Sequence, residues 1–413
     1  MYSLNPDCYP SPPGFAQMGI PASLVEAVRL FKLKRMLNQK QSTVKFPQMP
    51  LIQVGQVSIP NCLENQGLLC VGSKKNRLNA TISLMRQLKQ RTNFRGVVFD
   101  LGGELLERFY DPALDTIFAP SGDDAEGGML YDHASLRQRQ GRTQTLRDHR
   151  SIAWCHKSEP ISGKELARLL INVDPADPFF YQAAIEVLAV IFENSNTNDE
   201  VWQKLNVLMP QDLQAYLPSE NSLASEMLRE PVCAVAVTRI IKNVTQFYRY
   251  LGSESKFSFY NWGNNDDPGW LFIPWFDGDT EDVALMPLRQ MAIDLVLQGL
   301  LARKEVVHHR TAVVIPDLTC LKVNSLPNFV MECRHRQCHG FPLLGVESVS
   351  SAIAGYGQQK TQVIFECMQT KLLFNEGLAV VSNLTLVNKQ NLPDRQGYLT
   401  VDGCFAKVKV SDE

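Results

Sequence analysis

Residues Gly72 to Asn79 occupy the place where an α/β nucleotide-binding chain carries its phosphate-binding loop. An apolar run at 67–71 predicts a buried strand and residues 80–90 predict a helix, so this segment joins the two. A loop of the G-x-x-x-x-G-K-[ST] type surrounds phosphates with backbone N–H groups, neutralises them with lysine and holds Mg²⁺ with a hydroxyl. Gly72 keeps the first position, but the glycine, lysine and hydroxyl are replaced, in that order, by Arg77, Leu78 and Asn79. The spacing therefore predicts a nucleotide-binding frame that has lost its phosphate chemistry.

The composition indicates a globular protein and gives no general reason to expect nucleic acid or a membrane. Of 413 residues, 45% are hydrophobic and 20% charged, and the formal net charge is −2. Binding of nucleic acid would therefore require a local basic patch. No apolar run approaches the roughly 18 residues of a membrane span, and the start lacks a signal-peptide pattern. The ten cysteines fit small core side chains in a reduced compartment. We therefore predict a cytoplasmic protein without an intrinsic membrane span.

After residue 50 the hydrophobic runs follow the rhythm of an α/β fold. Strand 67–71, helix 80–90 and strand 96–100 make a βαβ unit, which is the building block of a parallel sheet. The last part of the chain predicts a hairpin that turns at Asp402-Gly403. Further buried strands are predicted at 270–275, 311–315, 341–345 and 370–374.

The remaining segments have different patterns. Helical periodicity runs through 161–251 and is clearest at 181–192, a helix entered through Asp177-Pro178. Residues 121–150, rich in Gly, Asp, Arg and Gln, predict a mobile surface insertion, whose basic end is either solvated or in contact with nucleic-acid phosphates. We divide the chain into four segments. Residues 1–49 form an N-terminal arm with a helix, and residues 50–120 form the first nucleotide-binding-type part. Residues 121–255 form a polar insertion with an all-α domain, and residues 256–413 form the second nucleotide-binding-type part.

A basic helix over 22–38 belongs to the first of these segments. Basic side chains lie among apolar residues at helical spacing, so the helix either packs on its own domain or binds a partner or a membrane surface. The apolar positions are Leu24, Ala27, Val28 and Phe31.

Several segments match, in order, the pattern of one known family: Val97 to Pro120, Asp177-Pro-Phe-Phe180, Gly269-Trp-Leu-Phe-Ile273, Gly345 to Ser351 with Tyr356-Gly357, and Leu392 to Thr400. Together they resemble type IV coupling proteins, the TraD-like, RecA-fold ATPases of bacterial conjugation and type IV secretion. The resemblance spans about residues 50–410. It implies an α/β fold, a RecA-like P-loop-type parallel sheet domain with an inserted all-α domain.

The resemblance also locates further departures from the chemistry of the family. The apolar strand that carries the family's Mg²⁺-binding aspartate and water-activating glutamate ends here in Pro316 and Asp317, and the sensor glutamine corresponds to Glu347. Phosphoryl transfer depends on positioning and charge neutralisation, so we expect no ATP hydrolysis by this chain alone and no required cofactor. ATP with Mg²⁺ stays open as an alternative, with a candidate binding set of Gly72, Lys74, Lys75, Arg77 and Asn79.

One arginine is a candidate for a role in the site of a neighbouring subunit. Family members form rings and place an arginine finger in the neighbour's site, and Arg336 falls on that position, with Arg334 as an alternative. It either stabilises charge in an active neighbour or is a surface residue kept with the fold. The same stretch holds metal-ligand types, but their spacing is not a common zinc pattern, so we predict no metal at Cys333, His335, Cys338 and His339.

The resemblance and the departures together predict a degenerate coupling protein, a pseudo-ATPase subunit or adaptor in conjugative DNA transfer or type IV secretion. It would recruit substrate or secretion machinery, or complete a ring with further copies or with an intact coupling ATPase. The alternatives are a weak or partner-completed DNA-translocating ATPase and a regulator that binds nucleotide without cleaving it. Full family members carry N-terminal membrane helices that this sequence lacks, so association with the inner membrane would need a partner. Contact with DNA is expected from the resemblance alone.

Overall fold

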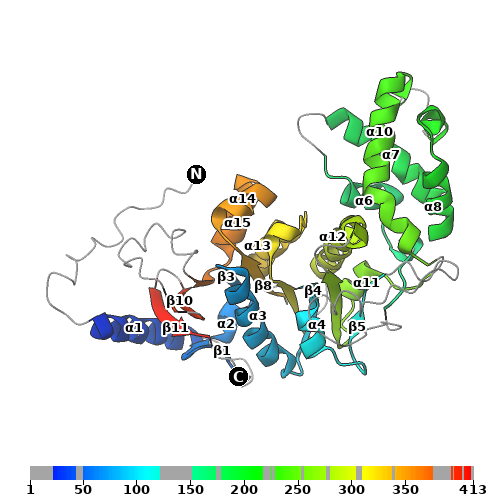
Figure 1. The fold of residues 1–413 in the computed structure, drawn as a ribbon. Helices are drawn as coiled ribbons and strands as arrows, with labels where there is room; N and C mark the ends of the chain where they lie inside the picture. Colours follow the sequence, from blue (N-terminus) through cyan, green and yellow to red (C-terminus); the bar gives the residue numbers. More distant parts are fainter. Residues whose placement is uncertain are drawn as a thin grey trace.

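A computed structural model of the chain describes residues 22–42, 50–120, 151–173, 178–216, 225, 228–252, 255–275, 280–303, 309–336, 340–374, 392–393, 395–401 and 404–410. These residues form an α/β body around a central sheet, with a group of helices at one end (Figure 1).

Within the described residues, nine strands form one sheet in the order β11-β10-β9-β3-β8-β7-β4-β6-β5. The neighbours from β9 to β5 pair in parallel, whereas β10 pairs antiparallel with both β9 and β11. The strands are β3 (Leu68–Val71), β4 (Phe94–Leu101), β5 (Thr116–Ile117), β6 (Trp270–Trp275), β7 (Arg310–Ile315), β8 (Gly340–Val346), β9 (Thr370–Leu373), β10 (Gln396–Val401) and β11 (Cys404–Lys409). The predicted strands are thus confirmed. The strands of the predicted C-terminal hairpin are present, while its turn lies outside the described residues.

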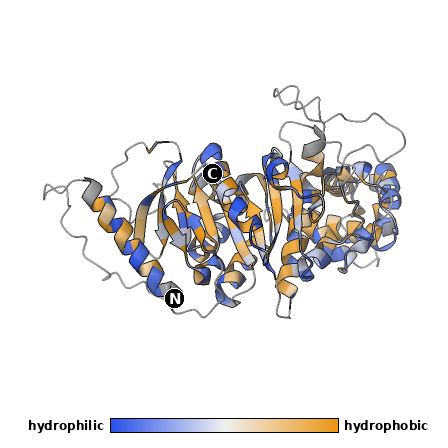
Figure 2. Ribbon diagram, turned by 90° about the horizontal axis from the view of Figure 1, so that it is seen from below, coloured by the Kyte–Doolittle hydropathy of each residue, from blue (hydrophilic) through white to orange (hydrophobic). Residues whose placement is uncertain are grey.

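The sheet is covered on both faces, as expected for a parallel sheet. On β3, Leu69 and Val71 belong to a hydrophobic cluster shared with α12 to α15, whereas Leu68 and Cys70 belong to a second cluster shared with α1 to α4. Figure 2 shows hydrophobic residues along the central strands and hydrophilic residues on the outer helices. The covering helices are α1 (Ala22–Ser42), α2 (Asn61–Glu64), α3 (Lys74–Lys89), α4 (Glu104–Phe109), α11 (Phe259–Asn264), α12 (Thr280–Ala302), α13 (Leu326–Arg336), α14 (Val349–Tyr356) and α15 (Gln358–Cys367). A small hairpin of β1 (Ile52–Val54) and β2 (Val57–Ile59) lies beside α3.

A group of helices between residues 156 and 250 lies at the end of the sheet opposite α1 (Figure 1). It consists of α6 (Gly163–Leu170), α7 (Pro178–Glu193), α8 (Asn198–Val207) and α10 (Pro231–Thr245), with the 3₁₀ segments η3 (His156–Ser158), η4 (Pro210–Tyr216) and η5 (Gln246–Tyr250). Helix α7 begins at the predicted proline, and α6 begins with a capping box between Ser162 and Glu165. The segment boundaries given above stay predictions, and the insertion at 121–150 lies outside the described residues.

Helix α1 packs on its own chain. Leu33 and Leu37 are buried in the cluster that includes β11, and the Arg29 guanidinium lies 4.7 Å from the ring centroid of Phe405. Of the apolar positions named from the sequence, Val28 and Phe31 are exposed, so the packing on this chain uses other residues. Apolar residues lie at helical spacing on two faces of this helix. Contact with β11 buries the face that carries Leu33 and Leu37.

Helix α12 corrects the expectation that no apolar run is long enough to cross a membrane. Among the described residues, this helix has the required length and hydropathy over Val283–Ala302. However, 67% of that window is buried, and its buried side chains belong to the hydrophobic cluster that α12 to α15 share with one face of the sheet. We therefore interpret α12 as a core helix.

Candidate functional site

The junction between β3 and α3 is not a loop. Helix α3 begins at Lys74, with Ser73 as its N-cap, so the predicted helix start at residue 80 is wrong and residues 74–79 form its first turns. The segment has no second glycine to break the helix, and Lys, Arg and Leu are good helix formers. A phosphate loop instead needs an extended run of backbone N–H groups that curves around the ligand. Only Gly72 and Ser73 remain between strand and helix.

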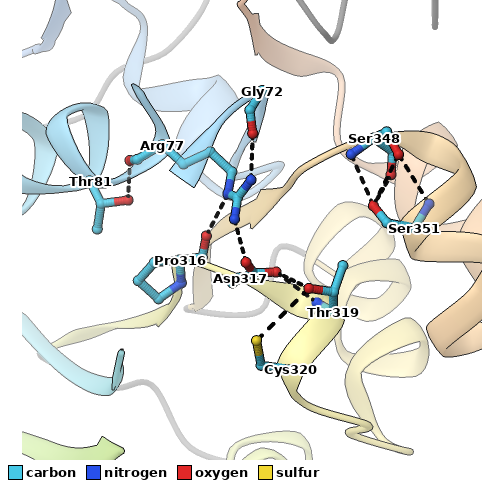
Figure 3. Close-up of polar contacts among 9 residues, drawn as sticks. All are labelled: Gly72, Arg77, Thr81, Pro316, Asp317, Thr319, Cys320, Ser348 and Ser351. Atoms are coloured by element: carbon cyan, nitrogen blue, oxygen red, sulfur yellow. Dashed lines mark hydrogen bonds and ion pairs between the residues drawn. The ribbon is translucent and has the colours of Figure 1, made fainter. Parts of the chain in front are cut away.

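Arg77 fills the space between this junction and the end of β7 (Figure 3). Its side chain is 2% exposed, and its Nε donates a hydrogen bond to the backbone oxygen of Pro316 at 3.1 Å. Its two terminal nitrogens donate to the backbone oxygen of Gly72 and to the carboxylate of Asp317. One guanidinium therefore joins the end of β3, the first turn of α3 and the end of β7.

The end of β8 closes the same space from another side. A Cβ added to Gly345 would lie 2.1 Å from the Pro316 backbone oxygen and 3.2 Å from Cδ of Arg77. Because real Cβ atoms do not approach an oxygen so closely, only glycine allows β7 and β8 to meet around the Arg77 side chain.

Asp317 is fully engaged by groups of its own chain. Besides the Arg77 guanidinium, its carboxylate accepts hydrogen bonds from the backbone N–H of Thr319 at 2.9 Å and from the Thr319 hydroxyl at 2.5 Å. It thereby caps the 3₁₀ turn η6 (Leu318–Cys320). These donors hold the carboxylate in a fixed position and occupy both of its oxygens. Thr319 was not identified from the sequence, although Asp-x-Thr is a common local capping pattern.

The other proposed phosphate ligands do not converge on this pair. Lys74 and Lys75 are exposed on the first turn of α3, and Asn79 is half-buried on the same helix. The Nδ2 atom of Asn79 is buried without a hydrogen-bond partner among the described residues. Gly72, Arg77 and Asp317 are therefore the predicted site residues that the fold brings together.

The sensor position lies on the next strand end. Glu347 follows β8 and is exposed, and in the described part of the chain no hydrogen bond or ion pair links it to Arg77 or Asp317. After it, Ser348 and Ser351 form a capping box that begins α14 (Figure 3). This segment is a well-formed helix start whose hydroxyls bond to each other and to the backbone.

Arg336 is the last residue of α13, which leads towards β8, and its side chain lies outside the described part. The alternative, Arg334, donates to the backbone oxygen of Glu366 at 2.8 Å within the same chain. Cys333 is buried in the core and His335 is exposed, while Cys338 and His339 are not described. Over the described ranges, no three His, Cys, Asp or Glu side chains are grouped to hold a metal.

A second buried carboxylate lies at the end of β4. Asp100 accepts backbone hydrogen bonds from Leu105 at 3.1 Å and from Leu106 at 2.7 Å, so it caps α4. Burial raises the pKa of Asp100 to about 6, although these N–H groups oppose the shift. Its oxygens face the start of a helix, which makes Asp100 a structural group of the strand end.

Comparisons with known proteins show the family and the fold of this chain. The family model described as "Type IV secretion-system coupling protein DNA-binding domain" matches residues 51–135 and 147–380. Coupling protein TraD of Escherichia coli (strain K12) is 24% identical over 365 residues, which cover 82% of this chain and 45% of TraD. The chain thus spans less than half the length of this relative.

Solved structures of the bacterial conjugative coupling protein TrwB share the fold. The trigonal form with sulphate has a TM-score of 0.71 at 17% identity and covers 91% of this chain and 92% of its own. TrwB in complex with ADP and Mg²⁺ has a TM-score of 0.70 at 18% identity, covering 92% and 91%. These likenesses confirm the predicted α/β class with a central parallel sheet.

Proposed function

The chain belongs to the family of type IV secretion-system coupling protein DNA-binding domains, as its segments predicted, and from this we propose that it is a degenerate coupling protein. It would act in conjugative DNA transfer or type IV secretion as a pseudo-ATPase subunit or adaptor. Its tasks would be to recruit DNA or secretion machinery, or to complete a ring with further copies or with an intact coupling ATPase.

The Arg77–Asp317 ion pair carries this proposal. In P-loop NTPases the phosphate loop and the end of the metal-binding strand are joined through the nucleotide and its Mg²⁺. Here the guanidinium of Arg77 joins the corresponding elements directly, through Gly72, Pro316 and Asp317. The fold would therefore hold the arrangement of the two strand ends without a bound nucleotide.

The residues around the pair do not fit a magnesium nucleotide. The Mg²⁺ carboxylate is replaced by Pro316, whose backbone oxygen already accepts a hydrogen bond from Arg77. The loop that would hold phosphates is helical, and Lys74 and Lys75 are exposed.

The relatives also suggest where the protein would work. TraD and TrwB are named as coupling proteins. We expect this chain to work on the cytoplasmic side of the inner membrane and to associate with the membrane through a partner.

The test is ATP binding and hydrolysis by the purified protein, with and without single-stranded DNA. We expect neither binding nor turnover by the wild-type chain. Arg86→Ala, on the same helix as Lys74, is the matched control for the Lys74→Ala variant. Turnover that disappears in Lys74→Ala but persists in Arg86→Ala would instead establish the weak ATPase. Binding without turnover would establish the nucleotide-binding regulator.

A further inference from the structure

A cavity of about 500 Å³ lies between the helical group and the α/β body. One wall comes from α6 and α7, and the other from α14, α15 and the segment that follows η6. The wall elements rise from the same side of the sheet (Figure 1). We call this cavity the basic cleft and define it by Arg168, Asn172, Lys322, Asn324, Tyr356 and Lys360.

The basic cleft concentrates positive charge in a protein of net charge −2. Three cations line it, namely Arg168, Lys322 and Lys360, and none of its described lining residues carries a carboxylate. Lys360 Nζ lies 3.4 Å from Asn324 Oδ1. No side-chain hydrogen bond or ion pair joins Arg168 or Lys322 to any residue that the structure describes.

One buried anion lies behind the wall, but it faces the backbone. Asp294 on α12 accepts hydrogen bonds from the backbone N–H groups of Asn324 at 3.1 Å and Ser325 at 2.6 Å. Its burial raises its pKa, and the nearby Lys360 opposes that shift. Among the residues that the structure describes, two of the three cations of the cleft, Arg168 and Lys322, therefore have no carboxylate partner.

The walls that carry these cations are fixed in position. The Tyr356 hydroxyl donates to the backbone oxygen of Leu321 at 2.6 Å and accepts from the N–H of Val323 at 3.3 Å. Across the cleft, Asn324 Nδ2 donates to Asn172 Oδ1 at 2.9 Å, so amide groups lie between the cations of the two walls. A ligand would meet charges and hydrogen-bonding groups that are already in place, which lowers the entropy lost on binding.

We propose that the basic cleft binds the phosphodiester backbone of single-stranded DNA, an inference that rests on the proposed role in DNA transfer. Cations supply the charge for phosphates, while amides suit sugar and base-edge oxygens and nitrogens. A sphere of this volume is only about 10 Å across, and a duplex is wider than its major groove of about 12 Å, so a duplex does not fit inside. Because its walls belong to the helical group and to the body, a bound strand would contact both.

The test is fluorescence anisotropy of a labelled single-stranded oligonucleotide with the whole chain at several salt concentrations. The cleft variant Arg168→Gln/Lys322→Gln/Lys360→Gln is compared with a control that removes the same charge elsewhere, Lys34→Gln/Arg239→Gln/Lys256→Gln. Neutralising three phosphate contacts in a single strand contributes about −2 to the slope of log K against log salt. We expect the cleft variant to lose about this much slope and at least tenfold in affinity, and the control variant to lose much less.

Each other outcome has a distinct meaning. If the wild-type chain binds but both variants lose equally, only bulk charge matters and the cleft proposal is overturned, while the proposed function stands. If the wild-type chain does not bind the oligonucleotide, DNA contact fails in both proposals. ATP turnover would overturn the pseudo-ATPase role without affecting the cleft.

Two further measurements keep the proposal falsifiable. If poly-glutamate displaces the oligonucleotide as well as unlabelled DNA does, an acidic peptide is the better ligand and the proposal is wrong. If the cleft variant does not fold, Gln182→Glu replaces it, since this exposed lining residue of α7 would add a negative charge to the cleft. We expect at least fivefold weaker binding of the single strand and an unchanged melting temperature, and unchanged binding would overturn the proposal.

Discussion

Arg77 and Asp317 are 240 positions apart in the sequence, yet their side chains form a buried ion pair that joins α3 to the end of β7. The pair occupies the region where P-loop proteins bring phosphate loop and metal strand together. In the proposed pseudo-ATPase, both residues thus have a structural role that needs no catalysis.

Removing one partner of this pair should destabilise the fold strongly. Arg77→Met leaves the Asp317 carboxylate buried with fewer donors, and loss of one partner of a buried ion pair typically costs about 3–5 kcal/mol. The double variant Arg77→Met/Asp317→Leu should lose at least about 1 kcal/mol less than the sum of the single variants. Urea unfolding of all three measures this coupling.

The control for this cycle is Arg86→Met on the same helix, which we expect to change the free energy of unfolding by less than about 0.5 kcal/mol. Additive losses from the two single variants would show that the contact contributes nothing specific.

Gly345 should tolerate no side chain. In Gly345→Ala the added methyl group meets the Pro316 backbone oxygen, so β7 or β8 must shift. Overpacking of this kind typically costs about 1–3 kcal/mol. Thermal unfolding of the variant checks it, and a melting temperature equal to that of the wild type would contradict the close packing.

Gly355 is the matched control for Gly345, and there we expect no loss of stability. A Cβ at Gly355, inside α14, meets nothing within 4 Å. Gly355→Ala should therefore be neutral or stabilising by up to about 1 kcal/mol, because alanine favours the helix.

Asp100 should make the protein more stable as the pH falls from neutral towards 4. Its folded pKa of about 6 lies above the ordinary value of 3.8, so the folded state binds the proton more tightly. The resulting stabilisation is fully present below pH 3.8 and is lost as the pH rises through about 6. The rise of the pKa from 3.8 to about 6 corresponds to a stabilisation of at most about 3 kcal/mol.

The measurement compares wild type with Asp100→Ser, whose hydroxyl still caps α4 but does not titrate. Between pH 7 and 5 the wild type should gain stability relative to the variant. Parallel curves for the two proteins would show that Asp100 does not titrate in this range.

Arg336 should matter only in a mixed assembly. With an intact coupling ATPase as partner, Arg336→Ala should slow the partner's ATP hydrolysis at least about tenfold, since arginine fingers contribute large factors to phosphoryl transfer. Arg334→Ala is the control, because that guanidinium already bonds to Glu366 of its own chain. Equal steady-state rates with wild type and Arg336→Ala would refute the finger.

The strands and several helices could be predicted because their signals are local. Apolar runs such as 270–275 and 311–315 are buried on both faces of the sheet, and the proline at 178 begins α7 as expected. The helix at 74–79 was missed because the expected phosphate loop outweighed its helix-forming residues. On α1, local periodicity left two faces possible for packing, and contact with β11 buries the face that carries Leu33 and Leu37.

The sequence by itself therefore determined the α/β rhythm and the family, and from it we predict the loss of the catalytic residue types at Leu78, Asn79 and Pro316. Only the tertiary structure decided which groups meet. It places Arg77 on Asp317, turns Lys74 and Lys75 outward, and brings Arg168 close to Lys322 and Lys360. The physical reason is that such contacts join strand ends and helices far apart in the chain, whose approach depends on the packing of the whole sheet rather than on any local preference.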